Sequence, residues 1–125
     1  MIHLDTNFLI RGLVRGTPQD KMLRDWLRSG ETLGMSTVAW TELLCGLIDT
    51  RHLQLATAIV SERVPLIEGD SVLAARLFNE SGRRRGTLAD CMIAATALRS
   101  KAPLATANPA DFNRFEDAGL TVLTA

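Results

Sequence analysis

The stretch Ile2-His3-Leu4-Asp5-Thr6-Asn7 decides the fold, because an apolar segment runs directly into a carboxylate and then into a turn. Ile2 to Leu4 reads as a short buried strand, and a helix is expected from about Asn7 to Val14. In an open parallel sheet, ligands bind at the carboxyl ends of the strands. Asp5 stands at such an end, so it is either placed for chemistry or only caps the following helix.

The same alternation of short apolar runs and amphipathic segments continues outward from this stretch. Ser36 or Thr37 can cap one of the expected helices, and Asp70 or Ser71 another. Strands that alternate with helices predict an α/β fold, here a central parallel sheet of four to five short strands with helices on both faces. The expected strands are Ile2–Leu4, Thr32–Ser36, Val64–Ile67, Pro103–Thr106 and Leu120–Leu123, and the further helices cover about 19–27, 37–47, 53–60, 70–79 and 88–98.

The composition limits the classes of function. A chain of 125 residues is expected to form one domain, covering residues 1–125. Fourteen basic side chains balance fourteen acidic ones, which argues against a protein that holds nucleic acid by bulk charge alone. No apolar run is long enough to cross a bilayer and the amino end does not resemble a secretory signal, so a cytoplasmic protein is expected. Cys45 and Cys91 are then expected to be buried free thiols.

Asp90 stands out because almost all of its neighbours in the helix from Leu88 to Leu98 are small or apolar. A lone carboxylate is costly to bury unless an arginine, backbone donors or a cation compensates its charge. Asp90 lies in the first turn of the helix, where the helix dipole also favours an acid. The alternative is an ordinary acid at a helix start that faces water.

Two further acids give weaker signals on their own. Glu42 is the single acid of a weakly polar helix, where a surface role is the default, and Asp111 follows Asn108-Pro109, where a cap or turn role is the default. Acids at strand ends and helix starts could nevertheless converge on one pocket, where they would raise one another's pKa. A divalent cation removes that conflict, and an all-oxygen ligand set favours Mg²⁺ or Mn²⁺ over zinc.

Four segments of the chain resemble the four motifs of PIN domains, in the same order and with similar spacing. They are Met1-Ile-His-Leu-Asp5-Thr6-Asn7, then Thr41-Glu42-Leu43-Leu44-Cys45-Gly46, then the run from Leu88 to Ala97, and finally the run from Leu104 to Phe112. The resemblance covers essentially the whole chain. It is closest to the VapC-type toxins of toxin–antitoxin pairs.

This resemblance implies a single PIN-like domain and a Mg²⁺- or Mn²⁺-dependent endoribonuclease that cleaves RNA with a metal-activated water. Cleavage of tRNA is common among such relatives, so tRNA is one candidate substrate. It implies that Asp5, Glu42 and Asp90 form the acidic core. Position 108 is Asn where the most acidic relatives carry a carboxylate, so either Asp111 supplies the fourth acid or Asn108 binds metal or water through its carbonyl. The resemblance also implies a homodimer and a small VapB-like antitoxin.

The expected roles follow from this implied chemistry. Asp5 and Asp90 would bind the metal directly, and Glu42 and Asp111 would hold a second ion or position its waters. Four supporting residues, Thr6, Asn7, Thr106 and Asn108, would orient the acids, contact phosphate or shape turns. The run Arg83-Arg84-Arg85 either clamps the RNA backbone beside Asp90 or is a solvated loop.

Three rival interpretations differ from this one in testable ways. A phosphatase of the haloacid-dehalogenase type needs a second Asp at the position of Asn7. A response-regulator receiver needs a late Lys, and Lys101 is poorly placed for that role. A catalytically silent PIN-fold module that binds RNA or protein would not need all three core acids, which are present here.

Overall fold

The computed structural model describes every residue from 1 to 125 and contains a five-stranded, fully parallel sheet. The strand order is β3-β2-β1-β4-β5. The prediction of an α/β fold with four to five short parallel strands is confirmed. The strands are β1 (Ile2–Leu4), β2 (Leu33–Ser36), β3 (Glu62–Val64), β4 (Leu104–Ala105) and β5 (Val122–Leu123).

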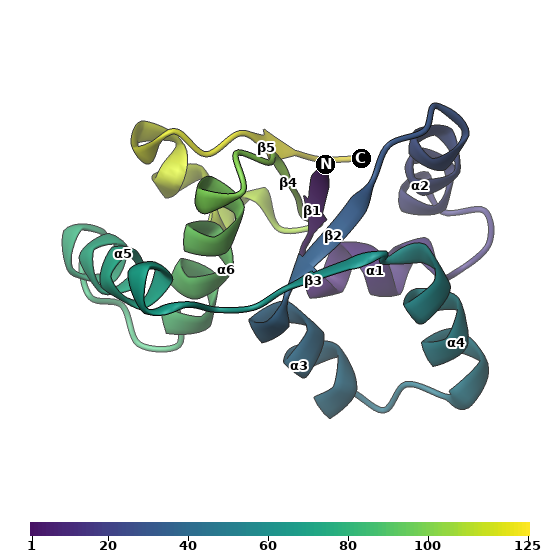
Figure 1. Ribbon diagram of the computed structural model, residues 1–125, viewed down its shortest axis with the longest axis horizontal. Coiled ribbons are helices and arrows are strands. Elements are labelled where there is room, and N and C mark those ends of the chain that lie inside the picture. The colour runs from purple at the N-terminus through teal and green to yellow at the C-terminus, as the bar shows by residue number, and fades with distance from the viewer.

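Helices cover both faces of this sheet (Figure 1). The helices α5 and α6 pack against each other on one side, while α1, α2 and α4 lie on the other. The bounds are α1 (Thr6–Gly12), α2 (Pro18–Arg28), α3 (Thr37–Cys45), α4 (Thr50–Ile59), α5 (Glu68–Glu80) and α6 (Leu88–Arg99), followed by the 3₁₀ helices η1 (Pro109–Asp111) and η2 (Asn113–Ala118).

The order of the strands creates a switch point between β1 and β4. From β1 the chain moves to β2 and β3 on one side, and β4 and β5 lie on the other side of β1. Right-handed crossovers in opposite directions place their helices on opposite faces, which leaves a crevice at the carboxyl ends of β1 and β4. Asp5 directly follows β1 and Thr106 directly follows β4, so both stand at this crevice.

Local signals in the sequence explain where most elements begin. Thr17 caps α2, and Pro18 follows at its first position, where a missing N–H costs nothing. The Ser36 hydroxyl caps α3 by accepting a hydrogen bond from the Val38 N–H at 3.1 Å, as expected. The middle of α6 is buried almost all round, which agrees with its unbroken apolar sequence.

Several expectations are corrected at element boundaries. The expected strand from Val64 to Ile67 is instead β3, because Pro65 cannot donate to the strand ladder. The helix α5 begins at Glu68, before Asp70 and Ser71, so neither of these is its N-cap. The segments η1 and η2 were not expected at all, since neither carries a long apolar period.

The expectation of two buried cysteines has a mixed outcome. Cys91 is buried as expected, whereas Cys45 is exposed, because it lies at the end of α3 where the chain turns away from the core. His3 is completely buried in β1. None of the helices combines the length and the apolar character that a membrane-spanning segment needs.

Candidate functional site

Asp5 is held at the end of β1 by hydrogen bonds to both of its carboxylate oxygens. Oδ1 accepts from the Thr6 N–H at 2.9 Å, which makes Asp5 the N-cap of α1. Oδ2 accepts from the Thr106 hydroxyl at 2.9 Å, across the switch point from β4. Only 6% of the Asp5 surface is exposed. The side chain therefore caps a helix and also faces the crevice, so the two alternatives are not exclusive.

The loop that follows β4 is fixed to the start of α1. The Asn7 carboxamide oxygen accepts from the Ala107 N–H at 3.1 Å. The Thr106 hydroxyl accepts from the Asn108 N–H at 3.0 Å while it donates to Asp5. These contacts make Asn7 and Thr106 positioning residues for the crevice. The Asn108 side chain is exposed and makes no hydrogen bond.

Glu42 reaches the same crevice from α3. The Thr6 hydroxyl lies 2.9 Å from the carbonyl oxygen of Ala39 and 3.3 Å from Oε1 of Glu42, and it can donate its proton to either. Glu42 is exposed, as expected for a lone helical acid. Its exposure does not separate it from the site, because its charge raises the pKa of both Asp5 and Asp90.

Asp90 lies in the first turn of α6, half-buried, and no hydrogen bond or ion pair involves its carboxylate. Desolvation, together with the charges of Asp5, Asp111 and Glu42, raises its pKa to about 7. Burial also raises the pKa of Asp5 to about 6, although its hydrogen bonds from Thr106 and Thr6 oppose that rise. Four carboxylates from four elements thus repel one another around one crevice.

Asp111 belongs to this group through its position in η1. It is exposed and its carboxylate makes no hydrogen bond, yet its charge raises the pKa of Asp5 and of Asp90. The structure therefore brings Asp111 toward the acids, whereas no contact links the Asn108 side chain to them. Between the two alternatives for the fourth position, these contacts favour Asp111.

The donor set has the chemistry that Mg²⁺ and Mn²⁺ prefer, namely carboxylate oxygens. However, no three His, Cys, Asp or Glu side chains are arranged so that together they could hold an ion. The carboxylates are close enough to influence one another's charge, which requires only a separation of several ångströms. They are too far apart to share one ion, because metal–oxygen bonds are only about 2 Å long. The residues fit a divalent cation in chemical type, and their side chains must turn toward one another to bind it.

The three arginines before α6 are all exposed, but they differ in their contacts. Arg83 adopts a positive φ of 54°, and its guanidinium donates to Oδ1 of Asn79. Arg84 lines a cavity together with residues of α5 and η2, and Arg85 lines none. The three consecutive arginines, which look equivalent in the sequence, therefore have different surroundings in the structure.

Arg114 was not expected at this site. It lies in η2, and its charge lowers the pKa of Asp90, so it is within electrostatic reach of the acids. A sequence signal does exist, because Arg114 stands between Phe112 and Phe115, whose side chains are both buried. Two buried aromatic rings three residues apart fix the path of the backbone beside an otherwise ordinary arginine.

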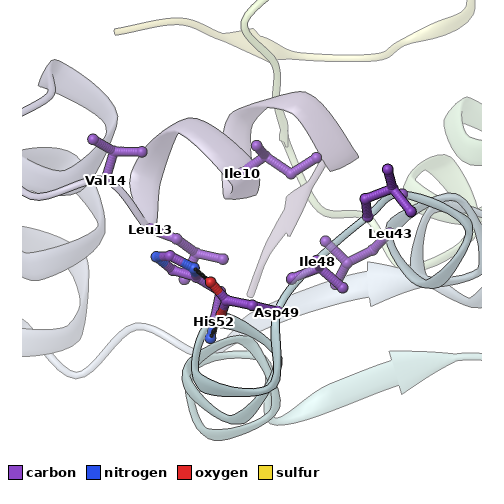
Figure 2. Close-up of a pocket in the computed structure, with 9 residues that line it drawn as sticks. Ile10, Leu13, Val14, Leu43, Ile48, Asp49 and His52 are labelled. Atoms are coloured by element: carbon purple, nitrogen blue, oxygen red, sulfur yellow. Dashed lines mark hydrogen bonds and ion pairs between the residues drawn. The ribbon is translucent and has the colours of Figure 1, made fainter.

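A separate apolar cavity of about 290 Å³ lies between α1 and the start of α4. Ile10 of α1 and the residues that follow this helix, Leu13 and Val14, line one side of it, and Ile48 and His52 line the other (Figure 2). Leu47, beside it, is fully exposed, and Ile10 and Val14 are about half exposed. Met22 and Trp26 of α2 are partly buried against the core, and Trp26 stacks on Phe8 with ring centroids 5.7 Å apart.

Residues 2–118 match the family model of the PIN domain. Solved structures with the same fold include VapBC2 from Rickettsia felis bound to promoter DNA (TM-score 0.77, 18% identity, 100% of this chain and 99% of that one). Another is VapBC-1 from nontypeable Haemophilus influenzae (0.71, 27%, 99% and 98%), and a third is DNA-bound VapBC from Salmonella typhimurium (0.73, 20%, 99% and 98%). No curated protein sequence matches this chain.

Proposed function

The chain belongs to the PIN-domain family, and from that premise we propose that it is a Mg²⁺- or Mn²⁺-dependent endoribonuclease and the toxin of a VapBC-type toxin–antitoxin pair. One observation carries the proposal: four carboxylates lie around the switch point of a parallel sheet, and their burial and mutual repulsion raise the pKa of Asp5 and of Asp90 there. Repulsion among carboxylates opposes folding, and a bound divalent cation removes that repulsion by neutralising their charges.

The acids divide into two roles in this proposal. Asp5 and Asp90 are the direct ligands, since they are the two most shielded carboxylates of the group. Glu42 and Asp111, which are exposed, hold a second ion or orient waters at the open side. When bound, a divalent cation lowers the pKa of a water and neutralises charge on the phosphate of the RNA.

The supporting residues hold the ligands in place. The Thr106 hydroxyl donates to Asp5 Oδ2 and so keeps that oxygen oriented and its carboxylate ionised to lower pH. The Thr6 hydroxyl can donate to Oε1 of Glu42 and so orient that carboxylate. Asn7 fixes the loop that carries Asn108 and Asp111 toward the crevice. Arginines beside the acids would supply the contacts to the RNA backbone.

The proposal includes a partner. Among the solved relatives, VapBC2 from Rickettsia felis and VapBC from Salmonella typhimurium are bound to DNA. For this chain we place a small VapB-like antitoxin on the apolar cavity of Figure 2, whose exposed leucine, isoleucine and valine side chains suit an amphipathic helix. A homodimer, a single domain over residues 1–125 and a cytoplasmic location belong to the same proposal.

The test is cleavage of structured RNAs, tRNA among them, by the purified chain with Mg²⁺ or Mn²⁺ and then with EDTA. Asp5→Asn and Asp90→Asn remove one carboxylate each, and Asp25→Asn is the matched control, since Asp25 is an exposed acid on α2. We expect cleavage by the wild type and the control alone, lost with EDTA. Variants that cleave as fast as the wild type would point to a contaminating nuclease.

A catalytically silent module that keeps the fold to bind RNA or protein is the alternative. It predicts no cleavage with any metal and no binding of Mg²⁺ or Mn²⁺ by calorimetry, although the chain is folded by circular dichroism. That result would exclude the nuclease. Measured binding of the ion, lost in Asp90→Asn, would exclude the silent module.

A further inference from the structure

A cavity of about 690 Å³ lies between the end of α5, the loop before α6 and η2. Each of these elements contributes one arginine to its lining, namely Arg76, Arg84 and Arg114. Glu80 and Asp117 line it as well, so three positive charges face two negative ones and one positive charge remains. Oε1 of Glu80 lies 4.0 Å from Nε of Arg76, with both side chains exposed.

Arg114 is the unusual member of this lining. Its Nε and Nη2 are buried and have no hydrogen-bond partner. The guanidinium lies 4.6 Å from the centroid of the Phe115 ring, and it takes part in none of the ion pairs. Buried donors without partners are rare, because they lose their hydrogen bonds to water and gain none within the protein. A forked guanidinium with free donors suits an oxyanion such as a phosphate.

The cavity is linked to the acids through Arg114. The charge of its guanidinium acts to lower the pKa of Asp90 and of Cys91, so it lies within electrostatic reach of the first turn of α6. Arg84 stands on the loop that leads into that turn, and its side chain makes no hydrogen bond or ion pair. A chain of nucleotides that crosses the acids could therefore continue into this cavity.

The neighbouring arginines lack these features. The Arg83 guanidinium is bound to Asn79 and lies 5.7 Å from the Phe78 ring centroid. Arg85 lines no cavity and takes part in no ion pair. The two therefore serve as internal controls with the same charge and nearly the same place in the chain.

We infer that the cavity lined by Arg76, Arg84 and Arg114 binds a backbone phosphate of the RNA next to the bond that is cleaved, with Arg84 and Arg114 as the donors. This rests on the proposed function, since it takes the four acids as the cleavage site. The same chemistry would accept free inorganic phosphate, and the experiment separates the two sources.

The experiment measures binding of a fluorescently labelled single-stranded RNA by anisotropy, with EDTA present so that metal-dependent cleavage is off. Titrations from about 50 to 200 mM salt give the slope of log affinity against log salt. The variants are Arg84→Ala, Arg114→Gln and Arg114→Lys, with Arg83→Ala and Arg85→Ala as controls. We expect Arg84→Ala and Arg114→Gln to weaken binding about tenfold and to reduce the slope by about 0.7 each, the value for one phosphate contact on a single strand.

Arg114→Lys keeps the charge but not the fork, so it should fall between the wild type and Arg114→Gln. Both controls should bind as the wild type does. If Arg114→Gln fails to fold by circular dichroism, Arg84→Ala decides alone, because Arg84 is exposed on a loop.

Equal affinities and slopes for all variants, with metal-dependent cleavage intact, would overturn the phosphate site and leave the nuclease standing. A wild type that neither binds RNA nor cleaves it would overturn both. Inorganic phosphate that raises the melting temperature of the wild type but not of Arg114→Gln, with RNA binding unchanged in that variant, would show a free-anion site and overturn the RNA assignment.

Discussion

The surroundings of Asp90 disfavour the ionised form of its carboxylate. Three other acids raise its pKa, and it has no hydrogen bond or ion pair in return. Its pKa in the folded chain is about 7, well above its ordinary value of 3.8. At pH values between these two, the folded state therefore holds a proton that the unfolded state has released. Stability from this group is therefore present at low pH and is lost as the pH rises through about 7.

Replacing Asp90 by Asn should stabilise the metal-free chain at alkaline pH while it abolishes cleavage. The gain should be full above pH 7 and should vanish near pH 4, since Asn mimics the protonated acid. A gain of 1 kcal/mol would raise the melting temperature by roughly 4 °C in a chain of this size. Differential scanning calorimetry in EDTA at several pH values measures it, with Asp25→Asn as control. A variant less stable than the wild type at alkaline pH would contradict the crowded arrangement of acids.

Thr106 acts on Asp5 through one hydrogen bond of 2.9 Å. That bond lowers the pKa of Asp5 against the effect of burial, so Thr106→Val should raise this pKa above about 6. If Asp5 must be ionised to work, the acid limb of the pH–activity profile then moves to higher pH. Rates of RNA cleavage across the pH range measure this shift.

Thr106→Ser keeps the hydroxyl and should restore the wild-type profile, which a purely structural role of the methyl group would not do. An unchanged profile in Thr106→Val would mean that ionisation of Asp5 does not limit the rate. Valine also leaves the Asn108 N–H without its acceptor, so melting temperatures of both variants should be compared.

At the scale of elements, a buried ion pair ties α5 to the end of α6. Oδ1 of Asp70, whose side chain is 2% exposed, lies 2.8 Å from Nε of Arg99, which also donates through Nη2 to the Pro65 carbonyl at 2.9 Å. Oδ2 accepts from the Ile67 N–H at 3.1 Å. The pair thus joins the exit of β3, the first turn of α5 and the last turn of α6.

Asp70→Ala should destabilise the fold by about 2 to 4 kcal/mol, because it leaves Arg99 and the Ile67 N–H without partners. The cost stays below that of a fully buried pair, since Arg99 is partly solvated. Urea denaturation measures it, with Glu68→Ala, an exposed acid in the same turn, as the control. RNA cleavage at low temperature should remain, because Asp70 is not part of the acid group. A loss under 1 kcal/mol would mean that solvent replaces the pair.

The elements themselves were largely predictable, because every strand except β3 is a short, mostly apolar run and each α-helix carries a cap or a helical period. The failures have specific causes. Pro65 interrupts an apolar run that otherwise reads as strand, and Asp70 looks like a cap but pairs with an arginine 29 residues away. The 3₁₀ helices after Asn108 follow from tertiary packing of Phe112 and Phe115, which no local period announces.

For the whole molecule, the sequence identified the acids but not their arrangement. The meeting of Asp5 with Thr106 depends on β4 returning beside β1, a pairing that joins residues about one hundred positions apart. The sequence did not identify Arg114, because what distinguishes this residue is a pair of buried donor atoms without partners, and these depend on the packing of the folded chain. Whether Asp5, Glu42, Asp90 and Asp111 bind metal stays a prediction that rests on the resemblance and on their mutual repulsion.

The acids and His3 together set an unusual dependence of stability on pH. His3 is buried with both ring nitrogens unpaired, and desolvation lowers its pKa to about 4, so the folded chain keeps it neutral where the unfolded chain protonates it. Alone, this makes stability fall as the pH drops from 6.5 toward 4. Asp5 and Asp90 act in the opposite direction, because their pKa values of about 6 and 7 lie above the ordinary 3.8.

Between about pH 4 and 6, Asp5 and Asp90 each hold a proton in the folded metal-free chain that they lack in the unfolded chain, whereas His3 lacks one that it holds there. The folded chain therefore binds one more proton than the unfolded chain. Its stability should rise as the pH falls through this range, by at most about 1.4 kcal/mol per pH unit. Melting temperatures in EDTA should therefore be higher near pH 5 than near pH 8. Added Mg²⁺ should reverse the order, because the ion binds ionised carboxylates. His3→Phe should raise the melting temperature more near pH 5 than near pH 8, since Phe needs no proton removed. A metal-free chain that instead loses stability steadily from pH 8 to 5, with His3→Phe unchanged in slope, would show that the acids do not repel one another as their positions at the crevice require.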